Sequence, residues 1–291
     1  MANVDALVPP RAALVVAVLA VSTSAVLVRW SDAPSLVKAL YRVVFTAALL
    51  APVALTRHRR AFAGLRRRDV GFAAASGLAL AVHFGAWFES LNHTTIAASV
   101  TLVQTQPAFV AAGAWAVLDE RVTPRTVVGI VVALAGAATM SIGDALVAGV
   151  GQAYGNALAL VGAAAAGGYV LAGRSLRQRL PLLPYVLIVY LVCAAGLLAV
   201  VVRTGYPLFD YPSREWTLFL AMAVGPGLFG HTVVNWALAH LESSVVSVSL
   251  LGEPVGSTLL ALVFLGEVPA VWTLIGGVVV LVGIVVTATP Q

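Results

Sequence analysis

The chain has 291 residues, of which 60% are hydrophobic and 10% are charged, and its mean hydropathy is +0.98. This composition is too apolar for a soluble globular domain and is typical of an integral membrane protein. The net charge is +5, but the basic residues gather in particular loops, as an orientation signal in a membrane requires, so we expect no nucleic-acid partner.

Ten apolar runs approach the length of about 20 residues that a helix needs to cross a bilayer. They are residues 12–28, 35–55, 70–91, 94–117, 126–142, 154–172, 183–202, 216–239, 243–265 and 272–288. The first run has the length of a signal peptide, but nine more follow, so we interpret it as an uncleaved helix. The eighth is broken by Gly225-Pro226-Gly227. Such a break is tolerated in a membrane only where it packs on protein or lines a cavity.

The two halves of the chain carry the same residues at one offset. Pro, Glu and two Gly residues recur 147 positions later in a single register, as Pro107, Glu120, Gly129, Gly136 and then Pro254, Glu267, Gly276, Gly283. Shared apolar composition does not easily produce such matches, so the chain contains an internal duplication. We interpret these eight residues as structural, with the glycines at helix-packing contacts.

The expected fold is all-α and membrane-integral, with ten transmembrane helices in two inverted five-helix repeats. The first repeat is residues 11–142, residues 143–153 form a connecting loop, and the second repeat is residues 154–289. Most of the 17 Lys and Arg residues fall on one side if both chain termini are cytoplasmic. Because each repeat has an odd number of spans, the two have opposite orientations. Inverted repeats of this kind place a substrate site near the bilayer midplane.

Ionisable side chains within the apolar runs are the strongest functional signals, because each costs about 2.5–3.5 kcal/mol at the centre of a membrane helix. Glu253 lies roughly 15 Å from the inner end of its run, at about 1.5 Å per residue, and so near the midplane. At the repeat offset its counterpart is Gln106, and we expect the two side chains to approach each other across the pseudo-twofold axis. Glu253 is either a hydrogen-bonded structural acid or a substrate or proton site.

Arg42 lies within the second run. Either it extends to the membrane surface, or it faces a cavity and pairs with Glu253 or an anionic substrate group. His83 and His231 are buried packing residues or ligands. The other substrate-binding candidates are an amide and several aromatic residues, whose flat faces suit planar or cationic ligands, although aromatic residues near span ends are also interfacial anchors. They are Asn235, Trp87, Tyr169, Tyr190 and Trp236.

Enzyme motifs are missing from the sequence. It contains no Gly-rich phosphate loop, no HExxH and no GxSxG. The single cysteine, Cys193, lies in an apolar run, which excludes a disulfide framework and a cysteine metal site. We therefore expect no catalytic residue, no cofactor and no metal.

The residues around 91–136 and 238–283 resemble the EamA-type repeat of the drug/metabolite transporter superfamily. The resemblance rests on the repeated Pro, Glu and Gly residues, on Leu265-Gly266-Glu267, and on Tyr41-Arg42 in the second helix; Asp119 departs from the family's usual Gly. It implies ten helices, with the first four of each half around a central cavity and the fifth and tenth peripheral. It also implies transport of small metabolites, often export of amino acids.

We therefore expect an inner-membrane secondary transporter that exports a small amphipathic metabolite, such as an amino acid, by alternating access. Its partners are the small-molecule substrate, the lipid bilayer and, if transport is coupled, protons; we expect a monomer or a weak dimer. Two alternatives stay open. One is a proton-coupled exporter of cationic drugs, with Glu253 as the counter-ion, and the other is a membrane protein that transports nothing.

Overall fold

The computed structural model describes residues 9–118, 123–148, 150–177, 181–237, 249–250 and 252–288, and these residues form helices and no strand. The first half contains α1 (Pro10–Ser22), α2 (Ser24–Trp30), α3 (Ser35–Arg57), α4 (Arg59–Ala63), α5 (Arg67–Ser90), α6 (Ile96–Val103), α7 (Gln106–Leu118) and α8 (Pro124–Ala148). The second half contains α9 (Val150–Arg177), α10 (Leu182–Thr204), α11 (Ser213–Met222), the π-helical segment η2 (Ala223–Thr232), α12 (Val233–Ala237), α14 (Gly252–Leu265) and α15 (Val271–Ala288).

Several helices have the length and composition to cross a membrane. Five are long and apolar enough by themselves, namely Pro10–Trp30, Ser35–Arg57, Arg67–Ser90, Gly151–Ala172 and Leu182–Thr204. Three shorter apolar helices are Pro124–Met140, Gly252–Leu265 and Val271–Val286. Large apolar side chains such as Val15, Leu19 and Val278 are more than half exposed, as expected where lipid is the solvent. The chain is a multi-pass helical membrane protein, and ten spans stays a prediction.

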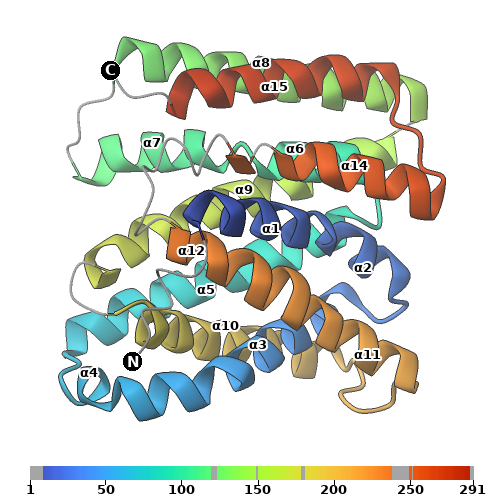
Figure 1. The fold of residues 1–291 in the computed structure, drawn as a ribbon. Helices are drawn as coiled ribbons and strands as arrows, with labels where there is room; N and C mark the ends of the chain where they lie inside the picture. Colours follow the sequence, from blue (N-terminus) through green and yellow to red (C-terminus); the bar gives the residue numbers. More distant parts are fainter. Residues whose placement is uncertain are drawn as a thin grey trace.

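The helices lie roughly along one direction in a stacked bundle (Figure 1). Helix α1 begins at the same end of the bundle as α4, and α15 runs back to that end, whereas α2 and α11 lie at the opposite end. We call the opposite end the Glu215 end, after a residue at the start of α11. The main core joins α2, α3, α5, α10 and α11 through large buried side chains such as Phe88, Tyr185 and Phe219.

Helices α8 and α15, the last of each half, lie side by side at one edge of the bundle (Figure 1). A Cβ atom at Gly136 would lie 2.7 Å from the Gly276 carbonyl oxygen, and one at Gly283 would lie 2.7 Å from the Gly129 carbonyl oxygen. These two pairings run in opposite senses along the chain, so the helices are antiparallel. The four repeated glycines allow the two backbones to touch, as small residues do at membrane helix interfaces.

Two stretches differ from the sequence-based expectation. Residues 143–148 and 150–153, expected in a connecting loop, are helical, because α8 continues to Ala148 and α9 begins at Val150. The polar residues here are interspersed with alanine, a strong helix former, and a helix can continue beyond the hydrocarbon core. The fourth apolar run is not one helix either, since it is divided between α6 and α7 at Gln104 and Thr105.

The predicted break in the eighth run is present as η2, which contains Pro226. It packs closely on the first half, because a Cβ atom at Gly227 would lie 2.5 Å from the Thr46 hydroxyl and one at Gly230 would lie 2.6 Å from a Val21 methyl. Thr46 Oγ1 also lies 3.3 Å from the carbonyl oxygen of Ala223. The irregular backbone is therefore covered by protein, as its position in a membrane requires.

Candidate functional site

Arg42 lies on α3 and is only 2% exposed, so it does not extend to the membrane surface. Its guanidinium carbon is 4.6 Å from the ring centroid of Phe84, 5.6 Å from that of Phe88 and 5.9 Å from that of Trp87. Its Nη1 donates a hydrogen bond of 2.9 Å to the Ser24 hydroxyl. The cation is thus held by aromatic faces and one hydroxyl, and no carboxylate neutralises it directly within the described residues.

Glu253, the second residue of α14, is 7% exposed. Its carboxylate accepts a 2.7 Å hydrogen bond from Nε2 of Gln104, which lies at the break between α6 and α7. Arg42 and Glu253 interact electrostatically, but in the part of the chain that the structure describes they form no ion pair. A basic and an acidic side chain, one from each half, are therefore buried in one region without forming an ion pair among the described residues.

A helix break and a proline lie next to Gln104 in the first half. Pro107 is the second residue of α7, a position where the missing N–H has no helical acceptor to lose. The regular helix is interrupted at Gln104 and Thr105, so Gln104 belongs to neither α6 nor α7. Its side chain can therefore reach across to the second half.

Three further predicted residues share this neighbourhood. His83 Nδ1 is 2.9 Å from the Gly162 carbonyl oxygen, and its ring stacks on Trp87 with a centroid distance of 5.9 Å. Tyr190, on α10, interacts electrostatically with Arg42. His231, on η2, interacts electrostatically with both Arg42 and His83. We call the following residues the Arg42 cluster: Ser24, Arg42, His83, Phe84, Trp87, Phe88, Gln104, Tyr190, His231 and Glu253.

The remaining candidates lie elsewhere. Gln106, expected opposite Glu253, is partly exposed at the start of α7, and the contact with Glu253 comes from Gln104. Trp236 packs against a small apolar cluster of α1 and α12 residues that includes Leu14 and Ala17. Tyr169 stacks on Tyr185 with a centroid distance of 6.5 Å. The side chain of Asn235 and the whole of Glu120 lie outside the described residues.

Glu267, the repeated acid of the second half, joins three elements. Gly266 ends α14 with a positive φ of 65°, and the N–H groups of Gly266 and Glu267 return to the Leu262 and Ala261 carbonyls at 3.2 Å each. The carboxylate of Glu267 then accepts from the backbone N–H of Ile96, at the start of α6, and pairs with Arg29 at 3.2 Å. It has a structural contact rather than a place in the Arg42 cluster.

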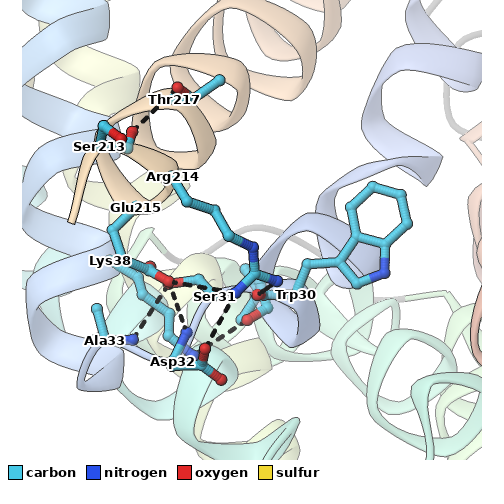
Figure 2. Close-up of polar contacts among 10 residues, drawn as sticks. Trp30, Ser31, Asp32, Ala33, Lys38, Ser213, Arg214, Glu215 and Thr217 are labelled. Carbon is cyan, nitrogen blue, oxygen red and sulfur yellow. Dashed lines mark hydrogen bonds and ion pairs between the residues drawn. The ribbon is translucent and has the colours of Figure 1, made fainter.

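A second polar cluster, which we call the α11 clamp, lies at the Glu215 end and consists of Ser31, Asp32, Lys38, Arg214 and Glu215. Figure 2 shows Arg214 and Glu215 of α11 directed at the turn between α2 and α3. Glu215 accepts from the Ser31 hydroxyl and from the backbone N–H of Asp32, the latter at 3.0 Å. Arg214 pairs with Asp32 at 3.0 Å, and Lys38 donates to the Val28 carbonyl at 3.0 Å. The clamp joins the two halves at this end.

Sequence analysis did not select Gln104, Ser24, Phe84 or Phe88, which contact Glu253 or Arg42. One sequence feature could have identified Gln104. It is a second amide in the same apolar run, two residues before Gln106. Helical spacing did not separate the two, because the backbone between them is not a regular helix. From the sequence, Phe84 and Phe88 look like ordinary core residues. Their contact with the Arg42 guanidinium is visible only in the structure.

The fold and this cluster define a helical membrane protein with two related halves and a buried polar centre between them. The EamA-like transporter family matches residues 12–142 and 153–289. The chain belongs to this family, whose members are membrane transporters of the drug/metabolite transporter type. One solved crystal structure of a protein resembles it with a TM-score of 0.65 and 20% identity, covering 94% of each chain, which shows the fold alone. No curated protein matches it.

Proposed function

We propose that this chain is a secondary transporter that exports a small amphipathic metabolite, such as an amino acid, by alternating access between its two halves. The observation that carries the proposal is the buried pair of Arg42 and Glu253, which come from different halves and form no ion pair among the described residues. Buried charges are costly in a membrane and normally serve a substrate or ion path. Opposite charges in one site suit the carboxylate and ammonium groups of a zwitterion.

Export of cationic drugs is the alternative, with Glu253 as the counter-ion. The rings of Phe84, Trp87 and Phe88 would be natural faces for an organic cation, but the Arg42 guanidinium already lies against all three. A second cation at the same rings would meet like charge. The cluster therefore favours a zwitterion or an acid over a cation.

Alternating access requires that contacts between the halves break at one end while others form at the other. The α11 clamp and the Arg29–Glu267 pair are contacts of this kind at the Glu215 end. We further propose that this end is outside the cell and that both termini are in the cytoplasm of an inner-membrane protein. The basic residues at the α4 end, such as Arg59, Arg60 and Arg67, support that orientation.

The proposal is tested by uptake into proteoliposomes that contain the purified full-length chain. Radiolabelled protein amino acids and a fluorescent quaternary ammonium dye are supplied in parallel, with protein-free liposomes as the background. We expect concentrative exchange of at least one amino acid and no dye uptake. Dye uptake alone would support the cation exporter, and uptake of neither would contradict both forms of the proposal.

A further inference from the structure

Two buried hydrogen-bond donors in the Arg42 cluster have no acceptor among the residues that the structure describes. Arg42 is 2% exposed and Trp87 is 3% exposed. Among the described residues, Nη2 of Arg42 and Nε1 of Trp87 are buried side-chain nitrogens without a hydrogen-bond partner. Both belong to one contact, since the guanidinium carbon lies 5.9 Å from the Trp87 ring centroid.

Leaving such groups unsatisfied costs free energy that the fold has to offset elsewhere. A buried donor without an acceptor has lost its hydrogen bonds to solvent without replacement, and this loss is larger at a charged group. Arg42 also lacks a direct carboxylate partner within the described residues, so its charge is uncompensated at contact distance. Arginine and tryptophan side chains donate and do not accept, so only an acceptor can satisfy both sites.

An anionic acceptor fits better than a neutral one. The guanidinium remains charged in a protein, and hydrogen bonds between ionised partners are about twice as strong as neutral ones. Because Nη1 already donates to Ser24, Nη2, with its two N–H groups, is the nitrogen that a ligand would engage. A carboxylate can place one oxygen on that donor and the other on the indole N–H.

We propose that Nη2 of Arg42 and Nε1 of Trp87 form a carboxylate subsite, which binds the acid end of the transported molecule and rejects the corresponding amide. This inference rests on the proposed transport function and names the chemical group that the site selects. The same cluster contains Glu253, whose side chain accepts from Gln104 at 2.7 Å and interacts electrostatically with Arg42. A carboxylate has more acceptor positions than one donor fills, so Glu253 can also accept from the ammonium group of an amino acid.

The first test is competition in proteoliposomes. Uptake of a mixture of labelled protein amino acids is measured against unlabelled amino acids and against the matching amino-acid amides. We expect the amides to compete at least about tenfold more weakly, as expected from the loss of a hydrogen bond to a charged group. In Trp87→Phe, which keeps a ring and loses the N–H, KM for the acids should rise about tenfold and the preference over amides should shrink.

The matched control is Trp115→Phe, since Trp115 on α7 is 64% exposed and has no place in the cluster. It should leave uptake and the acid preference unchanged. A second measurement does not depend on transport. The chain has six tryptophans, and ¹⁵N labelling of the indoles gives one N–H signal for each, with that of Trp87 assigned by its loss in Trp87→Phe. The amino-acid mixture should shift this signal, and the amides should not.

The results separate the two proposals. Equal competition by acids and amides, with amino-acid uptake intact, would overturn the carboxylate subsite and leave the transport function standing. A shift of the Trp87 signal by amino acids without any uptake would overturn export while supporting the subsite. Neither uptake nor a shift would overturn both.

Discussion

At the residue scale, the principal fact is that, within the described part of the chain, Glu253 is hydrogen-bonded by an amide and forms no ion pair. A carboxylate buried in a membrane protein requires a partner, and Gln104 supplies one hydrogen bond without neutralising the charge. The sequence indicated that Glu253 was unusual, since it lies in the middle of an apolar run. It did not indicate which amide would reach it, because that depends on the break between α6 and α7.

Glu253→Gln should abolish most transport and leave the fold intact. Glutamine has the same size and can still accept from Gln104, but it removes the charge that interacts with Arg42. We expect amino-acid exchange to fall more than about tenfold, which corresponds to ~1.4 kcal/mol or more. Thermal unfolding in detergent should change little. Proteoliposome exchange and unfolding are measured on the same preparation.

The control for this substitution is Glu89→Gln, because Glu89 is a partly exposed acid at the end of α5 that accepts from Asn92 at 3.1 Å. It should transport normally. Normal exchange by a well-folded Glu253→Gln protein would show that Glu253 has a scaffold role only.

At the element scale, the repeated glycines determine how the two halves meet at one edge. Gly136 and Gly276 face each other, and Gly129 faces Gly283, so α8 and α15 touch backbone to backbone. The interpretation of these residues as packing contacts needed only their spacing of seven. Their mutual pairing across the two halves is visible only in the structure.

Gly136→Ala should destabilise the protein, because the new Cβ would lie 2.6 Å from the backbone nitrogen of Val280. Overpacking of this kind costs about 1–3 kcal/mol. Gly71→Ala, on α5, is the matched control, since a Cβ there meets nothing within 4 Å, and alanine favours the helix. Thermal unfolding should show a lower midpoint for Gly136→Ala only. Equal midpoints would contradict the close α8–α15 contact.

Glu215→Ala should loosen the α11 clamp. It removes the acceptor of the Ser31 hydroxyl and of the Asp32 N–H. It also removes the acid that interacts most strongly with the buried Lys38, leaving Asp32 and Glu89. We expect a loss of about 1–3 kcal/mol. A cysteine placed at Ala33, which is 5% exposed, should then react faster with a maleimide. Asp210→Ala, at an exposed acid near the same end, should leave the reaction rate unchanged.

At the scale of the whole molecule, the main question is how the two halves are oriented in the membrane, which a labelling experiment can answer. The antiparallel α8 and α15 and the opposite ends reached by α4 and α11 agree with two halves of opposite direction (Figure 1). The distribution of Arg residues predicts which end is cytoplasmic. Together with ten spans, that prediction places both termini in the cytoplasm.

Single cysteines at Ala61 and at Ala148 should react from opposite sides of the membrane. A membrane-impermeant maleimide is applied to right-side-out and to inside-out vesicles. Cys193 is 0% exposed and should not react. The unsubstituted chain, in which Cys193 is the single cysteine, is the control for this. Reaction of both positions from the same side would contradict ten spans in two inverted repeats.

The sequence by itself determined the properties that depend on composition and spacing. High hydropathy specifies a membrane protein because backbone polar groups in lipid must be satisfied within helices. The offset of 147 residues between Pro107 and Pro254 recurs for the repeated Glu and Gly residues and indicates duplication. Gly225-Pro226-Gly227 predicts a helix break, because the proline lacks a backbone N–H and the glycines lack side chains. These are local or periodic properties of the chain, and they need no knowledge of which helices become neighbours.

Only the tertiary structure decided which side chains meet. Arg42 and Tyr41 are adjacent, yet Tyr41 joins the aromatic residues of α11, stacked on Phe219 at 5.0 Å, whereas Arg42 lies among Phe84, Trp87 and Phe88. Gln104 rather than Gln106 reaches Glu253 because a helix break changes the direction of its side chain. Such contacts depend on helix rotation and on chain interruptions. A shift of one residue turns a side chain by about 100° around a helix, and apolar periodicity in an all-round hydrophobic span does not fix that angle.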